Sequence, residues 1–246
     1  MANPARQFLL PMAALFQIAG SSLPQVYGWG EPIGARSLAL DTDIVPAGWA
    51  FSIWGIIFIW SLIFALYAAG RSVDRAALAD KITWPAIGAF SMNGVWGLYT
   101  PFFGLTILSE IIILLGLFCA LFAALASSRF PAKTASERFL IAAPLGLVAG
   151  WLTAASFVGG SSVLLGQGVE MTNVVMVSIL GAATVFAGLI ILNRPSPTYA
   201  FAIFWALAAV ISKNLDGGNQ TIIYAAATAI GALVLVTLYS LKRRSV

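Results

Sequence analysis

Glu110 and Lys213 are the charged residues of this 246-residue chain that stand within or at the end of a long apolar stretch. A charge in such a setting is costly, so it marks a candidate functional group. We expect Glu110 to face the interior of the protein and to pair with Lys213 or with a polar neighbour. The alternative is that Glu110 extends from the end of its stretch toward a membrane surface.

The eight tryptophans are a second group of candidates. Some stand near the ends of apolar stretches, where tryptophan commonly anchors at the membrane–water boundary: Trp29, Trp49 and Trp84. Others lie deeper and could line one cavity: Trp54, Trp96 and Trp151. Asn93 stands one helical turn before Trp96 and could supply a hydrogen bond there. The alternative for each tryptophan is aromatic packing between helices.

Missing residue types exclude several classes of site. The chain has no histidine, which excludes a His-ligated haem, an imidazole-based zinc site and a His-based catalytic triad. The single cysteine, Cys119, lies in an apolar run, where we expect a small buried residue rather than a ligand. We therefore predict no metal site. Without an activated nucleophile or a cofactor fingerprint, we also predict no enzymatic activity.

The elements that must position these residues are membrane helices. Hydrophobic residues make up 60% of the chain and charged residues 9%, against about 25% charged in soluble domains. A membrane helix needs about 20 mostly apolar residues. Eight stretches qualify: Phe8–Val26, Val45–Ala69, Ile82–Tyr99, Leu105–Ala126, Phe139–Val158, Val174–Leu192, Tyr199–Ser212 and Thr221–Leu241. We predict an all-α fold, a polytopic membrane helix bundle of about eight transmembrane helices.

The positive charges predict how the bundle is oriented. With eight spans, eleven of the 13 Lys and Arg residues fall on the face that carries both termini, including Arg71, Arg75 and Lys133. The opposite face has two, Arg36 and Lys213. Positive loops stay in the cytoplasm, so both termini are predicted there. Charges scattered among short loops give no support for nucleic-acid binding.

The longest connection on the non-cytoplasmic side is residues 27–44, which carries Glu31, Asp41 and Asp43. Long connections often cover binding sites, so this loop is the expected cover of an outward-opening cavity. Close helix packing is predicted at two pairs of small residues, Ala183 with Ala187 and Ala227 with Gly231.

Three segments resemble the TspO/MBR family, the tryptophan-rich sensory proteins related to the mitochondrial translocator protein. They are Pro46-Ala-Gly-Trp49-Ala-Phe51-Ser-Ile-Trp54, then Asn93-Gly-Val-Trp96 with Phe102-Phe103, then Trp151-Leu-Thr-Ala-Ala155. The likeness covers roughly residues 5–166. Phe51 and Trp54 are three apart where the family usually has four with a Pro between them, and Gly159 replaces an expected Asn. The core family stops after five helices, so the chain looks like a longer relative.

The resemblance implies a five-helix bundle whose apolar pocket binds tetrapyrroles and, in some members, sterols or synthetic ligands. Carried over by position, the ligand-binding residues are Trp49, Phe51, Trp54, Asn93, Trp96, Trp151 and Ala155. A porphyrin would be held by stacking and shape, because no histidine can ligate it. We expect residues 1–166 to form this bundle and residues 167–246 to add three helices packed on it as one unit.

We predict an integral ligand-binding protein of sensory or transport type in a bacterial inner (plasma) membrane. Its expected partners are the lipid bilayer and a flat hydrophobic, tetrapyrrole-like molecule. Two alternatives remain: a secondary transporter that uses the extra helices, and an accessory subunit of a larger membrane complex. The sequence leaves open a homodimer or other membrane-complex partners.

Overall fold

The computed structural model describes residues 4–70, 76–129, 135–194 and 196–245. These residues form helices and no strands, which confirms the predicted all-α fold. The long helices are α1 (Pro4–Tyr27), α3 (Ile53–Ala69), α4 (Ala76–Phe103), α5 (Ile107–Arg129), α7 (Ala143–Gly166), α8 (Asn173–Asn193), α9 (Pro197–Asn214) and α10 (Gln220–Ser245). The short ones are α2 (Ile33–Ala39), the 3-10 helix η1 (Gly48–Ser52), α6 (Ala135–Glu137) and the π-helix η2 (Arg138–Ala142).

Six segments of the described residues are long and apolar enough to cross a membrane. They lie on α1, η1 with α3, α5, α6 to α7, α8 and α10. The chain is therefore a multi-pass membrane protein. Helices α4 and α9 are outside this set. The count of eight spans stays a prediction.

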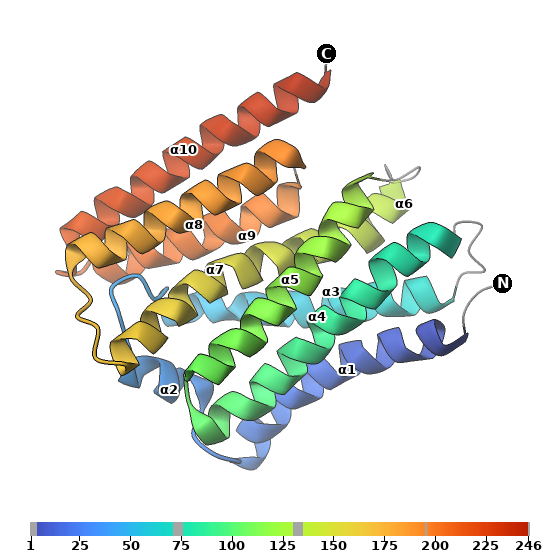
Figure 1. Ribbon diagram of the computed structural model, residues 1–246, viewed down its shortest axis with the longest axis horizontal. Helices are drawn as coiled ribbons and strands as arrows, with labels where there is room; N and C mark the ends of the chain where they lie inside the picture. The colour runs from blue at the N-terminus through green and yellow to red at the C-terminus, as the bar shows by residue number, and fades with distance from the viewer. Residues whose placement is uncertain (1–3, 71–75, 130–134, 195, 246) are drawn as a thin grey trace.

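The long helices lie side by side and alternate in direction (Figure 1). The start of α1 and the end of α10 lie at the same end of the bundle, as an even number of alternating helices requires, whereas α2 lies at the other end (Figure 1). Which end faces the cytoplasm stays a prediction. Arg71, Arg75 and Lys133, which contribute to the predicted charge asymmetry, lie outside the described residues.

The helices pack in a definite order. Helix α4 packs between α1 and α5, and α5 also packs on α7. The last three helices, here called the C-terminal layer (α8, α9 and α10), join this group mainly through α9 on α7. Within the layer, α10 packs against both α8 and α9.

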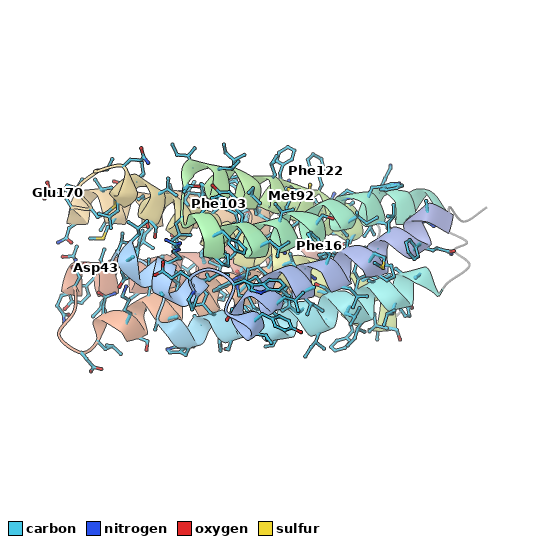
Figure 2. The ribbon with its side chains drawn as sticks, turned by 90° about the horizontal axis from the view of Figure 1, so that it is seen from below. Phe16, Asp43, Met92, Phe103, Phe122 and Glu170 are labelled. Atoms are coloured by element: carbon cyan, nitrogen blue, oxygen red, sulfur yellow. The ribbon has the colours of Figure 1, made fainter. Side chains whose placement is uncertain are left out.

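Large apolar side chains cover the outside of the bundle. Phe103 and Phe122 are both more than half exposed, and Figure 2 shows them among the outward-pointing side chains. Lipid tails solvate such side chains, so they need no protein partner.

Glycines let the backbones approach most closely at two crossings. A β-carbon on Gly20 of α1 would collide with the Gly94 carbonyl of α4, and one on Gly150 of α7 would collide with the Tyr199 carbonyl of α9. The two predicted small-residue pairs differ in burial. Ala187 is fully buried, whereas Ala227 and Gly231 are exposed. That second prediction is wrong because those two residues lie on the outward side of α10.

Candidate ligand-binding site

A cavity opens where α1, α2 and the segment leading into α3 meet. Its main part, the large lobe, has a volume of about 700 Å³ and is lined by side chains that include Ser21, Gln25, Phe58 and Lys213. Pockets that hold drug-sized ligands span roughly 300–1,000 Å³. The large lobe is therefore big enough for a small organic molecule.

A second part, the small lobe, adjoins the first and has a volume of about 70 Å³. Phe51, Trp54 and Trp96 line both lobes, so these rings stand between them. The rest of the small lobe comes mainly from α5 and α7, including Glu110 and Trp151. The two lobes share these aromatic walls, and we treat them together as one candidate site.

Edge-to-face ring contacts fix these walls. The ring of Trp151 lies 6.0 Å from that of Phe51 and 6.2 Å from that of Trp54, at interplanar angles of 87° in both cases. Aromatic pairs favour this arrangement because the positive ring edge faces the negative ring face. Trp151 is only 3% exposed, so the cluster holds its ring in one position.

Five of the seven residues proposed from the family resemblance line the cavity: Phe51, Trp54, Trp96, Trp151 and Ala155. Trp49 lines neither lobe. Its ring packs edge-on against Trp205 at 4.8 Å, and its Nε1 donates to Ser212 Oγ at 3.3 Å. Trp49 and Phe51 are two residues apart on a 3-10 helix with three residues per turn, so they point to different sides.

Asn93 also lines neither lobe. It is buried, and its Nδ2 donates to Gln17 Oε1 at 3.2 Å, which joins α4 to α1. The predicted hydrogen bond to a ligand is therefore replaced by one between helices.

The predicted Glu110–Lys213 pair is not formed. Lys213 Nζ instead makes a salt bridge with Asp41 Oδ1 at 2.5 Å and donates to the Thr42 carbonyl at 2.8 Å. The segment that leads into η1 runs past the end of α9, and this places Asp41 next to Lys213. Lys213 lines the large lobe, whereas Glu110 lines the small one.

Helix α9 holds the cavity wall along residues 41–50. Asn214 Nδ2 donates to the Asp43 carbonyl at 2.8 Å, and Trp205 Nε1 donates to the Ala50 carbonyl at 2.9 Å. The backbone N–H of Ala47 donates to the Ala209 carbonyl at 3.1 Å. The C-terminal layer thus fixes the segment that carries Phe51 into the cavity, a role that the sequence pattern did not reveal.

The predicted cover of the cavity is partly helical. Ile33 and Ser37 of α2 line both lobes. Arg36 of the same helix forms a salt bridge with Glu31 at 3.0 Å and donates to the Pro101 carbonyl of α4 at 3.3 Å. These bonds attach α2 to the end of α4 beside the cavity.

The position of Glu110 explains why a glycine stands at residue 159. A β-carbon at Gly159 would lie 2.7 Å from Glu110 Oε2, too close for both to stay in place. Glycine therefore leaves room for the carboxylate at the position where the family resemblance led us to expect Asn. The polar group at this point of the wall comes from α5 instead of α7.

Comparison with known proteins identifies a family. A family model described as TSPO-like protein matches residues 8–239. The match runs through the C-terminal layer, well beyond the residues 5–166 over which motifs were found. No curated protein and no solved structure matched the chain.

Proposed function

The chain belongs to the TSPO-like protein family, and from this premise we propose that it binds a flat, hydrophobic, tetrapyrrole-like molecule in the two-lobed cavity. The observation that carries the proposal is a space of about 700 Å³ whose walls include Phe51, Trp54 and Trp96. Flat apolar ligands gain from such walls, since each aromatic contact contributes about 0.5–1.5 kcal/mol beyond burial.

In this proposal the ligand is held by the shape of the cavity and by stacking on its aromatic walls. The chain has no histidine, so imidazole ligation of a metal at the centre of a tetrapyrrole plays no part. The polar groups of the large lobe, among them Ser21, Gln25 and Lys213, would orient the polar edge of the ligand. We assign binding to this cavity and no catalytic step.

The proposal also includes an orientation. Both termini lie on the cytoplasmic side of a bacterial inner membrane, and α2 with its neighbouring cavity lies toward the opposite side. The support is the excess of Lys and Arg on the face that carries the termini. A ligand would therefore enter from outside the cytoplasm or from the outer leaflet.

A titration with protoporphyrin IX tests the proposal. Purified protein in detergent is titrated while the absorption of the porphyrin is followed, and we expect saturable binding. Trp96→Ala removes a ring that lines both lobes and should weaken binding about ten-fold. Trp84→Ala is the matched control, because Trp84 is half-exposed on α4 and lines neither lobe. Absence of saturable binding, or equal loss in both variants, would contradict the proposal.

A further inference from the structure

Two polar groups that line the small lobe have no partner in the described part of the chain. The Glu110 carboxylate, in the first turn of α5, makes no hydrogen bond or ion pair with a described residue. Trp151 Nε1, on a side chain that is 3% exposed, is an unpartnered buried donor. Two residues that line one small space thus carry an acceptor and a donor without a partner among the described residues.

Other charged groups around the cavity are paired. Asp41 is bound by Lys213, and Arg36 is bound by Glu31. Buried polar groups in proteins are nearly always satisfied, so the buried Trp151 Nε1 calls for a partner that no described residue supplies. The Glu110 side chain is only partly buried, and its carboxylate lines the same lobe without a partner among the described residues. The contrast singles out Glu110 with Trp151.

Glycines and a small open space surround the Glu110 carboxylate. Glycines occupy the wall beside the carboxylate: a β-carbon at Gly159 would lie 2.7 Å from Oε2, and one at Gly160 would lie 4.0 Å from Oε1. The small lobe, at about 70 Å³, has room for a few non-hydrogen atoms but not for a flat ring system. It suits one substituent of a ligand whose body lies in the large lobe.

We propose that the small lobe is a subsite for a positively charged, hydrogen-bond-donating nitrogen carried by the ligand. The Glu110 carboxylate accepts from that nitrogen, and Trp151 Nε1 donates to an acceptor atom at the adjoining edge of the ligand. An anionic substituent is disfavoured there because it would meet the carboxylate in an apolar surrounding. This inference rests on the proposed function and adds a charge requirement to it.

Three pyrenes that share one flat apolar body test the requirement. They are 1-pyrenemethylamine, which is a cation at pH 7, neutral 1-methylpyrene, and anionic pyrene-1-carboxylate. Affinity for the purified protein in detergent is measured by energy transfer from tryptophan to pyrene. The cation should bind about ten-fold more tightly than the neutral compound, which corresponds to about 1.4 kcal/mol, and the anion should bind most weakly.

Glu110→Gln should abolish the preference for the cation, measured as the ratio of the affinities for 1-pyrenemethylamine and 1-methylpyrene. Glu170→Gln is the matched control, because Glu170 is exposed between α7 and α8, at the end of the bundle where Figure 2 labels it. Gly159→Ala is a second route to the same result, since its added carbon displaces the carboxylate without removing it.

The outcomes separate the two proposals. If 1-methylpyrene binds saturably but 1-pyrenemethylamine binds no more tightly, the charged subsite is wrong and the binding cavity stands. Retention of the preference in folded Glu110→Gln and Gly159→Ala variants would also overturn the subsite. If no pyrene binds saturably, the cavity proposal fails and the subsite fails with it.

Discussion

Asp41 and Glu110 are two acidic side chains that line the same cavity in opposite circumstances. Asp41 lines the large lobe and is bound by Lys213, from a helix 172 residues further along the chain. Glu110 lines the small lobe, and its carboxylate is bound by no described residue. Both residues carry a carboxylate, so the difference between them is that the fold supplies a cationic partner for Asp41 and none among the described residues for Glu110. The first carboxylate holds a wall in place, and the second is open to a ligand.

The difference follows from the C-terminal layer. Helix α9 reaches residues 41–50, where it binds the Asp41 side chain and donates to the backbone carbonyls of Asp43 and Ala50. The Asp41–Lys213 pair is partly exposed, so it adds at most about 1 kcal/mol to stability. The main effect of this ion pair is to hold the segment that precedes Phe51 in place.

The largest effect is expected when α9 is pushed away from α7. In Gly150→Leu, the new side chain would collide with the Tyr199 carbonyl and with Ala202, so the helices must separate and Lys213 leaves Asp41. We expect a loss of about 3 kcal/mol or more in the free energy of unfolding, seen as a lower melting temperature in detergent.

Gly181→Leu is the control for this change, since a β-carbon there meets nothing within 4 Å. Its melting temperature should stay the same or rise slightly, because leucine favours the helix over glycine. Equal destabilisation by both substitutions would contradict the close α7–α9 contact.

A pair of variants should sharpen the contrast by shifting stability in opposite directions. Glu110→Met replaces an unpartnered carboxylate with an apolar chain of similar length, and should raise the stability of the ligand-free protein by about 1 kcal/mol. Asp41→Asn removes one charge of a formed ion pair and should lower stability by up to about 1 kcal/mol. Thermal unfolding in detergent measures both. Shifts of the same sign would mean that the two carboxylates do not differ as described.

The smallest effect is expected at Trp49, which neighbours the cavity without lining it. Trp49→Phe keeps the ring against Trp205 and removes the hydrogen bond to Ser212, so stability should fall by about 0.5–1 kcal/mol. Porphyrin affinity should not change. A marked loss of affinity in the folded variant would place Trp49 in the site.

Much of the helical fold could be predicted, because runs of about 20 apolar residues have few other solutions in a bilayer. The eight predicted stretches each correspond to one long helix. The structure adds what hydropathy cannot show, such as α2 within the loop and the 3-10 turn at the start of α3. Both depend on local hydrogen bonds and on neighbours that are distant in the sequence.

The candidate site could be predicted in part. Trp54, Trp96 and Trp151 were predicted because they lie deep within apolar stretches and in segments that resemble the family, and they do line the cavity. Asn93 was misplaced because the sequence does not show that Gln17 of α1 faces it. The partner of Lys213 was misassigned because depth alone cannot choose between acidic residues that different loops bring near it.

Crystals grown with 1-bromopyrene would show whether the large lobe binds a flat apolar molecule, because bromine marks the ligand by its anomalous scattering. We expect an anomalous peak inside the large lobe, beside Phe51, Trp54 and Trp96, at the same place in independent crystals. Peaks confined to the lipid-facing surface, for example beside the exposed ring of Phe122, with none in the cavity, would contradict it.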